Sequence, residues 1–265
     1  MLAEALPLIL TGAALVGGMM LLVWVIHLLI RNAAVVDVGW AAGLGILAVY
    51  YAMAGPGYAA RRYAIATMAA IWSLRLAGYL LFARVIGHPE EGRYVQLRTG
   101  WKTNLPLRFL LFFEFQAFLD LVLSIPFLLA CLNAHAPLGI LEKLGGAIWI
   151  LGITGEATAD AQLDGFKKNP ANKGKTCRVG LWNYSRHPNY FFEWTIWLGY
   201  AVFALGSPWG WLGLISPALI LYFLLGLTGI PATEAQALRS RGDEYRQYQR
   251  VTSAFVPWFP KKERA

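Results

Sequence analysis

The sequence predicts an all-α, polytopic membrane protein, on the evidence of its composition and of the length and pattern of its apolar segments. Of the 265 residues, 57% are hydrophobic and 14% are charged, and the mean hydropathy is +0.49. A soluble domain is about 45–50% apolar and about 25% charged. This composition excludes a disordered chain, a collagen and an ordinary cytosolic enzyme. Alternation with a period of two residues is not seen, which argues against an outer-membrane barrel, so the spans are expected to be helices.

Seven apolar segments are long enough to cross a hydrocarbon core of roughly 30 Å as helices. No Lys or Arg precedes the first of them, because the first basic residue is Arg31, so a cleaved signal peptide is not expected. We expect one membrane domain over residues 1–265, with four spans in 1–133 on the substrate side and three in 134–265 on the cofactor side. The expected spans are residues 6–30, 34–54, 62–86, 106–133, 138–157, 189–206 and 209–230.

The basic residues predict how the chain crosses the membrane. The net charge is +8, and Lys and Arg gather in segments 84–104 and 158–188 and in the tail after residue 230. Because basic loops stay in the cytoplasm, the N-terminus is expected outside and the C-terminus in the cytoplasm. Arg61 and Arg62, at the edge of an outer connection, are the exception to this pattern. The positive charge also suits an anionic ligand, whereas no soluble basic domain exists to bind nucleic acid.

Ionisable side chains inside spans are costly, so each is by default a functional hypothesis. Asp37 and Arg75 either pair structurally or belong to a ligand site, and the residues alone leave both alternatives open. Glu114 and Asp120 are six positions apart and are assigned to helix packing, while Glu142 is set aside because it can reach the interface. The full set is Asp37, Arg75, Glu114, Asp120, Glu156 and Glu193.

Glu156 and Asp160 are four positions apart and therefore share one helical face. Two such carboxylates suit a metal ion, sugar hydroxyls or pairing with Lys167 and Lys168. No His follows at helical spacing, so a metal is disfavoured and no metal site is predicted.

The segment 178–194 combines the start of a predicted helix with several polar side chains. Pro188 suits the first turn of that helix, and Asn189, Glu193 and Trp197 then lie on one face. The free N–H groups of the helix start, together with Arg178, form a potential anion site. The simpler alternative is a basic flank with aromatic residues at the membrane interface.

The sequence of the tail predicts a polar helix over residues 234–250, after Pro231. Leu238, Tyr245 and Tyr248 lie on one side of this helix. Aromatic residues follow in 254–260. The helix either lies on anionic lipid or covers a cytoplasmic site, and both alternatives stay open.

Four motifs resemble a known family. The segment Ser185 to Glu193 (SRHPNYFFE) and the tail segment 242–250 (GDEYRQYQR) resemble the membrane steroid 5α-reductase superfamily. The segments 37–40 (DVGW) and 72–75 (WSLR) resemble its bacterial branch, known as domain of unknown function 1295. The resemblance covers nearly the whole chain and is strongest in the C-terminal half.

The resemblance implies a seven-helix, monomeric enzyme of a bacterial inner membrane that takes NADPH from the cytoplasm. It reduces a carbon–carbon double bond conjugated to a ketone in a steroid or a similar lipid. A Gly-x-Gly-x-x-Gly fingerprint is lacking, so the cofactor site must be built between helices. The residues implied as cofactor contacts are Arg75, Arg93, Glu156, Asp160, Lys167, Arg178, Tyr184, Arg186, His187, Asn189, Tyr190, Glu193, Trp197 and Glu234.

The residues expected at the substrate site differ from those of the resembled family. Relatives hold the substrate ketone with a Glu and a Tyr, and this chain has Asp37 and Trp72 at the corresponding places. The indole N–H donates a hydrogen bond but cannot replace a phenol as an acid. We therefore expect Asp37 and Trp72 to be catalytic, and Trp40 and Phe118 to line the apolar substrate cavity.

Two rival functions stay open. Isoprenylcysteine and phospholipid methyltransferases, which use S-adenosylmethionine, also have an Arg-His-Pro-x-Tyr segment before a span. They often carry two adjacent Glu in the tail helix, where this chain has Glu234 followed by Ala235. The second rival is a non-catalytic, lipid-binding membrane protein whose buried charges only join helices.

Overall fold

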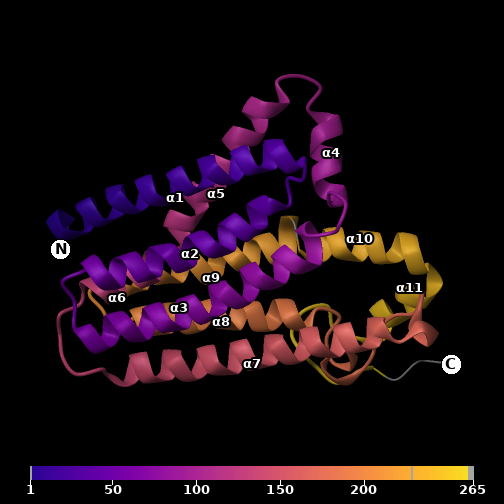
Figure 1. Cartoon of the computed structure of the whole chain (residues 1–265). Coiled ribbons are helices and arrows are strands. Elements are labelled where there is room, and N and C mark those ends of the chain that lie inside the picture. Colours follow the sequence, from indigo (N-terminus) through magenta and orange to yellow (C-terminus); the bar gives the residue numbers. More distant parts are fainter. Residues whose placement is uncertain (1, 228, 262–265) are drawn as a thin grey trace. The chain divides into compact units, whose positions relative to one another are not determined.

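A computed structural model describes residues 2–227 and 229–261 of the chain. These residues form helices joined by loops (Figure 1), and within them the only β-type pairing is an isolated bridge between Ser185 and Ser253. The all-α prediction is confirmed for this part of the chain.

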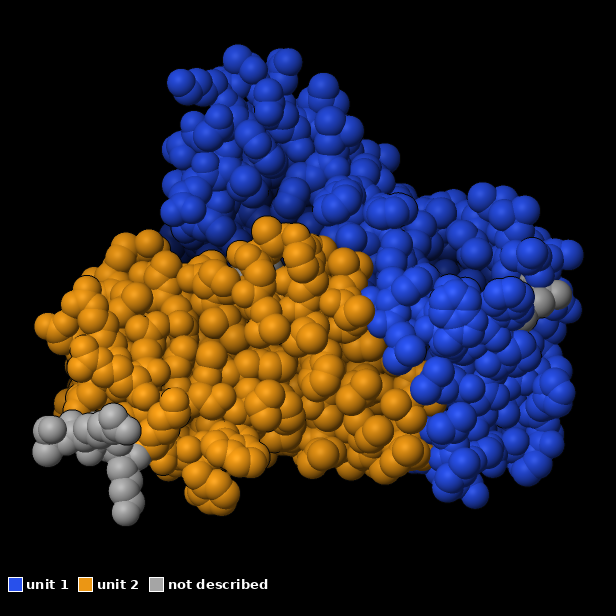
Figure 2. Space-filling model, turned by 180° about the vertical axis from the view of Figure 1, so that it is seen from behind, with its two compact units in different colours: residues 1–143, 203–215 blue, residues 144–202, 216–265 orange. Residues whose placement is uncertain are grey.

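The chain divides into two compact units (Figure 2): residues 1–143 with 203–215, and residues 144–202 with 216–265. The first unit, unit 1, contains α1 (Leu2–Ile30), α2 (Val35–Ala54), α3 (Ala59–Leu80), the π-helical turn η1 (Leu81–Val85), α4 (Gly92–Gly100), α5 (Leu105–Leu123), α6 (Ile125–Leu132) and η4 (Gly210–Leu214). The second, unit 2, contains most of α7 (Ile140–Lys168), η2 (Pro170–Asn172), η3 (Gly180–Asn183), most of α8 (Pro188–Ala204) and α9 (Ile215–Tyr222), and η5 (Phe223–Leu227), α10 (Ile230–Arg241) and α11 (Asp243–Val251).

Four helical segments of the described chain are long and apolar enough to cross a membrane: Leu2–Ile30, Val35–Ala54, Ala59–Val85 and Gly210–Arg241. A fifth is added if α5 and α6, which meet at a bend of 42°, count as one span. The other two expected spans fall on α7 and α8. The apolar part of α7 is interrupted by Glu156 and Asp160, and α8 has 17 residues. The chain is thus a membrane protein, and the count of seven and the orientation stay predictions.

In unit 1, α2 packs closely on its neighbours through glycine. A Cβ on Gly45 would lie 2.4 Å from the Ser73 hydroxyl of α3, and this hydroxyl donates a 2.7 Å hydrogen bond to the Ala41 carbonyl. A Cβ on Gly43 would lie 2.3 Å from Oδ2 of Asp120 on α5. Asp120 is fully buried, and neither of its carboxylate oxygens has a hydrogen-bond partner among the described residues. Small residues let membrane helices approach to this distance.

The position of Glu142 differs from the one predicted from the sequence, which placed this carboxylate at the membrane interface. It does not reach an interface but forms a buried ion pair with Arg61, with Nε and Oε1 2.9 Å apart and both side chains 2% exposed. The Arg61 guanidinium also donates to the carbonyls of Asn133 and His135, at 2.9 and 2.6 Å. The prediction was wrong because the charge that pairs with Glu142 belongs to Arg61, which is 81 positions away in the sequence. The pair also explains why Arg61 departs from the charge pattern, since its charge is neutralised inside the protein.

In unit 2, glycines again set the approach of two helices. A Cβ on Gly152 of α7 would lie 2.7 Å from Ile196, and one on Gly155 would lie 2.3 Å from Phe192, both on α8. From the α8 side, a Cβ on Gly199 would lie 2.7 Å from the Trp149 nitrogen. The start of α8 at Pro188 matches the prediction. The close packing places polar residues of α7 and α8 side by side.

The tail forms two helices where the sequence predicted one over residues 234–250. α10 ends at Arg241 and α11 begins at Asp243, because Gly242 has a positive φ of 56° and turns the chain. Tyr245 and Tyr248 pack with Ala237 and Leu238 in one cluster, as expected for residues on one side.

Candidate functional sites

The first candidate site lies at the start of α2, where Asp37 receives hydrogen bonds from α4. The Tyr94 hydroxyl donates to Oδ1 of Asp37 at 2.7 Å, and the Arg93 guanidinium pairs with Oδ2. Arg84, in η1, lies 3.8 Å from the same oxygen. The alternative in which Asp37 pairs with Arg75 is therefore wrong. The segment 84–104 folds into η1 and α4, and this brings its own cations to Asp37.

A second carboxylate attaches α4 to the start of α2. Glu90 accepts hydrogen bonds from Arg98 at 2.8 and 3.1 Å and from the backbone N–H of Ala33 at 2.9 Å. Burial by itself would raise the pKa of Glu90, but the bonds from Arg98 and Ala33 outweigh it, so the pKa lies below its ordinary value. Glu90 is thus charged at neutral pH and helps to hold α4 in place.

Tyr94 is the residue of this site that sequence reasoning missed. It is 2% exposed, and burial, followed by the adjacent Asp37 carboxylate, raises the pKa of its phenol well above the ordinary value. The hydroxyl therefore keeps its proton at physiological pH. Its position directly after Arg93 was the available signal, but only the fold of α4 shows that it turns toward Asp37.

The tryptophans expected near the substrate do meet. Trp40 and Trp72 form an edge-to-face pair with ring centroids 5.9 Å apart, and Trp72 is fully buried. Arg75 follows on α3, one turn after Trp72, and is half-buried. Trp40 and Trp72 thus form an aromatic contact, the aromatic wall, between α2 and α3, and Trp40 lies one helical turn after Asp37.

Phe118 does not belong to this wall. It is 57% exposed and stacks on Phe115, with ring centroids 6.3 Å apart. The buried face of α5 runs through Phe109, Phe113 and Ala117, so position 118 falls on the outward face. Apolar residues surround α5 on all sides, so the sequence hides this periodicity, and a role of Phe118 in substrate binding stays a prediction.

The second candidate site, in unit 2, is formed by α7 and the first turns of α8. The Asn189 side-chain amide donates to Oδ1 of Asp160 at 3.2 Å, and the Trp197 indole donates to Oε1 of Glu193 at 2.8 Å. The expected polar face of α8 is thus confirmed. Glu156 lies one turn before Asp160 on α7 and is 5% exposed.

Lys167 does not complete this group. It is exposed near the end of α7, and within the described residues it forms no ion pair. Lys168 is exposed as well, so the alternative in which Lys167 and Lys168 neutralise the α7 carboxylates is wrong, because α7 runs on beyond Asp160 and carries both lysines away from them.

Glu234 of α10 joins the tail to the start of α8. Its Oε1 accepts from Arg186 at 2.6 Å and lies 3.3 Å from the His187 ring, while its Oε2 accepts from Gln249 at 2.7 Å. The Tyr245 hydroxyl adds a 3.4 Å bond, and burial, with Glu234 next, raises the pKa of Tyr245 to about 12. The carboxylate therefore fixes both tail helices against the Arg-His-Pro segment.

The remaining predicted residues surround this junction. Arg178 donates to the Glu244 carbonyl at 3.3 Å and lies 5.2 Å from the Tyr248 ring centroid. Tyr190 stacks on His187 with ring centroids 5.3 Å apart, while Tyr184 is 39% exposed. Arg178 and Tyr190 are half-buried and Tyr184 is exposed, so these three side chains keep surface that a ligand can reach, whereas His187 is buried.

These features define a multi-helix membrane protein with one polar cluster at the start of α2 and another along α7 and α8. The sequence profile of the family described as "Protein of unknown function (DUF1295)" matches residues 23–252, and the chain belongs to this family. Within the described residues, no group of three or more His, Cys, Asp or Glu side chains is placed to hold a metal ion.

One curated relative adds a chemical indication. The chain is 40% identical over 63 residues to the "Probable O-methyltransferase ustE" of Ustilaginoidea virens. The match covers 24% of this chain and 22% of that protein, so the chain spans about a fifth of the relative's length. No solved structure matches the chain.

Proposed function

We propose that the protein is a membrane-embedded, NADPH-dependent reductase of a carbon–carbon double bond conjugated to a ketone, acting on a steroid or a similar lipid. The observation that carries this proposal is the 2.7 Å hydrogen bond from the buried Tyr94 hydroxyl to Asp37. A phenol beside a carboxylate is the pair with which the resembled family holds the substrate ketone. Tyr94 thus supplies the acidic group that Trp72 lacks.

The reaction needs a group that stabilises negative charge on the ketone oxygen. When bound, NADPH would supply a hydride to the β-carbon of the double bond, and a proton from water would add to the α-carbon to complete the reduction. As the ketone oxygen gains charge, the Tyr94 hydroxyl turns from Asp37 to that oxygen and donates a hydrogen bond, while Arg93 keeps Asp37 in position. Half-buried Trp40, which packs on the buried Trp72, provides an apolar surface for a flat lipid, as suits a pocket with few polar groups.

The cofactor is assigned to the polar face of α7 and α8. Asn189 with Asp160 offers an amide and a carboxylate that suit the paired donor and acceptor of a nicotinamide carboxamide. Glu193 lies one turn deeper on the same face of α8, and half-buried Arg178 is available for a phosphate or ribose. Glu234, Arg186 and His187 act on this site by holding the start of α8 in place.

A second candidate function is methyl transfer from S-adenosylmethionine, favoured by the 63-residue match to a probable O-methyltransferase. Methylation of a hydroxyl or carboxyl oxygen requires a group that removes a proton or leaves the oxygen charged. The raised pKa of Tyr94 keeps its phenol protonated at neutral pH, so it can donate a hydrogen bond but is not in the phenolate form that would remove a proton, which supports the reductase. Both functions require a cofactor at the same face of α8.

The expected setting is a bacterial inner membrane, with a monomeric protein whose tail lies in the cytoplasm. Lipid substrate then enters from within the bilayer, and NADPH enters from the cytoplasm. Both statements rest on the charge pattern of the loops and on the family resemblance.

Thermal stability of the detergent-purified protein, measured with NADPH, NADH or S-adenosylmethionine, tests this proposal. We expect NADPH to stabilise the protein by mass action. Asn189→Ala and Glu193→Ala should each weaken NADPH binding by roughly 1–3 kcal/mol, the range for a buried hydrogen-bonding group. Exposed Gln236→Ala, on α10, is the matched control and should leave the affinity unchanged.

Stabilisation by S-adenosylmethionine alone would select the methyltransferase. Stabilisation by none of the three ligands would favour the non-catalytic alternative. Unchanged NADPH affinity in both α8 variants would refute the assignment of this face.

A further inference from the structure

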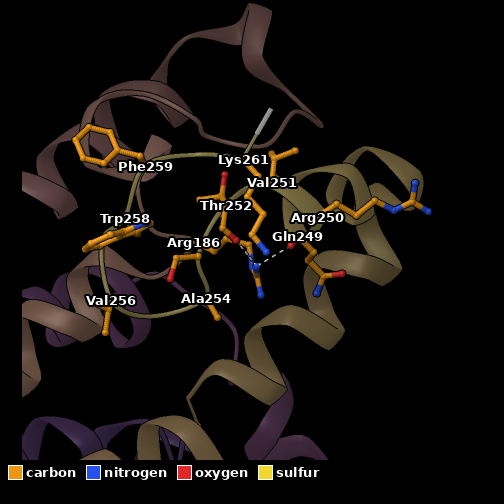
Figure 3. A pocket seen from close by; sticks show the side chains of 11 residues that line it. Arg186, Gln249, Arg250, Val251, Thr252, Ala254, Val256, Trp258, Phe259 and Lys261 are labelled. Carbon is orange, nitrogen blue, oxygen red and sulfur yellow. Dashed lines mark hydrogen bonds between the residues drawn. The ribbon is translucent and has the colours of Figure 1, made fainter. Parts of the chain in front are cut away.

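The C-terminal tail of unit 2 borders a partly open cavity of about 490 Å³ next to the start of α8 (Figure 3). Its lining includes the cations Arg186, Arg250 and Lys261 and no carboxylate. In Figure 3 the Arg250 side chain extends away from the cavity along α11, while Arg186 reaches into it. The Arg186 guanidinium is itself paired with Glu234 and bonded to the carbonyls of Gln249 and Thr252, so the exposed Lys261 is the cation that gives the cavity a positive charge suited to an anion.

Backbone hydrogen bonds fix the tail around this cavity. The Arg186 N–H donates to Ser253 at 2.8 Å, the Trp258 N–H to Tyr184 at 2.9 Å and the Lys261 N–H to Val251 at 2.8 Å. The cavity thus has a defined wall built by the fold.

The same tail is anchored to helices of the membrane region. Phe255 packs edge-to-face on Phe191 and Trp194 of α8, with ring centroids 5.6 and 6.0 Å apart. The Trp194 indole in turn donates to the Pro217 carbonyl at 3.1 Å, within the candidate span Gly210–Arg241. The tail is therefore tied, through α8, to a helical segment that is long and apolar enough to cross a membrane.

Large apolar side chains stand exposed beside the cavity. Val256 is 51% exposed, Trp258 is 69% exposed and Phe259 is 75% exposed, although the backbone that carries them is fixed. Holding such side chains in water is unfavourable. Tryptophan and other amphipathic aromatic residues are instead enriched at the headgroup level of a bilayer. These exposed residues indicate that lipid covers this part of the tail.

We propose that the cavity binds the headgroup of an anionic phospholipid. The lipid phosphate lies against Lys261, and Val256, Trp258 and Phe259 enter the interfacial layer beside it. Arg250 adds long-range attraction to the anionic surface. This site is separate from the proposed cofactor face, and it does not depend on which reaction the protein catalyses.

The test is a titration of detergent-purified full-length protein with short-chain phosphatidylglycerol, followed by thermal stability. Phosphatidylcholine and glycerophosphate, which lacks acyl chains, form the comparison arms. We expect phosphatidylglycerol to bind more tightly than either of them. A cation near an anionic lipid surface contributes a factor of about 5 in affinity, so Lys261→Ala should weaken binding about 5-fold and Arg250→Ala/Lys261→Ala more. Lys173→Ala, an exposed lysine of the loop after η2, is the matched control and should change nothing.

A second measurement places the aromatic residues. In vesicles that contain brominated phosphatidylglycerol, Trp258→Phe should remove part of the tryptophan quenching seen in the wild type. Equal affinity for phosphatidylcholine, or equal binding of glycerophosphate, would overturn the proposal, as would quenching that does not change in Trp258→Phe. Loss of NADPH or S-adenosylmethionine binding in the double variant would also overturn it, because the cavity would then belong to the cofactor site.

Discussion

Unit 1 contains two arginine–carboxylate pairs that are alike in chemistry and opposite in surroundings. Arg61 and Glu142 are each 2% exposed, whereas the side chains of Arg93 and Asp37 are 42% and 20% exposed. The Arg61 guanidinium also bonds to backbone carbonyls of the 133–137 connection, so its donors are used within the protein. The Arg61–Glu142 pair is therefore structural, because it has neither the exposed surface nor the free hydrogen-bond donors to bind a ligand.

The Asp37 pair is built differently. Its partners Arg93 and Tyr94 come from α4, a helix of nine residues held to α2 through Glu90 and Arg98. A short, partly exposed helix can exchange one hydrogen bond for another at low cost, so Tyr94 is able to leave Asp37 for a substrate oxygen. The difference teaches that burial and saturation, more than charge type, separate a structural ion pair from a functional one.

The largest effect is expected from breaking the buried pair. Arg61→Ala leaves the Glu142 carboxylate buried without its partner, which should lower the free energy of unfolding by about 3–5 kcal/mol. Denaturation monitored in detergent measures this loss. Lys143→Ala, the exposed neighbour of Glu142, should stay within about 0.5 kcal/mol of the wild type. A loss below 1 kcal/mol in Arg61→Ala would mean that the pair is not buried in the folded protein.

Removing the buried Tyr94 hydroxyl that donates to Asp37 should affect turnover more than folding. Tyr94→Phe keeps the aromatic packing and removes the proton donor, so reduction of a 3-oxo-4-ene steroid should slow by roughly 10²-fold. The rate of NADPH oxidation per folded molecule measures the effect. Exposed Tyr63→Phe is the matched control and should retain wild-type turnover. An unaltered rate in Tyr94→Phe would remove Tyr94 from the mechanism.

Asp120 extends the comparison to a buried carboxylate whose oxygens accept no hydrogen bond within the described residues. Because a Cβ on Gly43 would lie 2.3 Å from its Oδ2, Gly43→Ala should destabilise the protein by about 1–3 kcal/mol. Thermal unfolding should show most of this loss restored in Gly43→Ala/Asp120→Ala. Gly18→Ala, where nothing lies within 4 Å of the new Cβ, should not destabilise. Equal effects of the two glycine substitutions would contradict the close contact.

The smallest expected effect concerns the attachment of α4. The pKa of Glu90 lies below its ordinary value near 4.5, so its contribution to stability is fully present above that value. The contribution is lost as the pH falls through the folded-state pKa, because protonation weakens the bonds to Arg98 and Ala33. Hydrogen exchange at the Ala33 amide should therefore accelerate at acid pH beyond the change in intrinsic exchange rate. Glu90→Gln should remove this extra dependence, and an unchanged profile in that variant would show that Glu90 does not hold the amide.

Periodicity and composition were sufficient for the helical class and for the polar face of α8, because both depend on local spacing. Asn189, Glu193 and Trp197 repeat every four residues, and Pro188 marks the helix start. The partners of Asp37 and Glu142 were missed because they depend on which distant segments meet. Tyr94 reaches Asp37 from 57 positions away and Arg61 reaches Glu142 from 81, and no local pattern contains that information.

The outward position of Phe118 and the break at Gly242 were missed for other reasons. α5 is apolar on all sides, so its sequence does not show which face is buried. Gly242 is one of several glycines in helical context, and only its positive φ distinguishes it as a turn between α10 and α11.

The most direct test of the distinction between the two pairs is a matched measurement on Asp37→Asn and Glu142→Gln. Each substitution removes one negative charge and keeps a hydrogen-bonding amide. Thermal stability and steroid-dependent NADPH oxidation per folded molecule are measured on both proteins. We predict that Asp37→Asn stays folded, binds NADPH and loses turnover by roughly 10²-fold or more, while Glu142→Gln is strongly destabilised and its surviving fraction turns over normally. A destabilised Asp37→Asn protein with an intact rate would contradict the account, because Asp37 would then be structural.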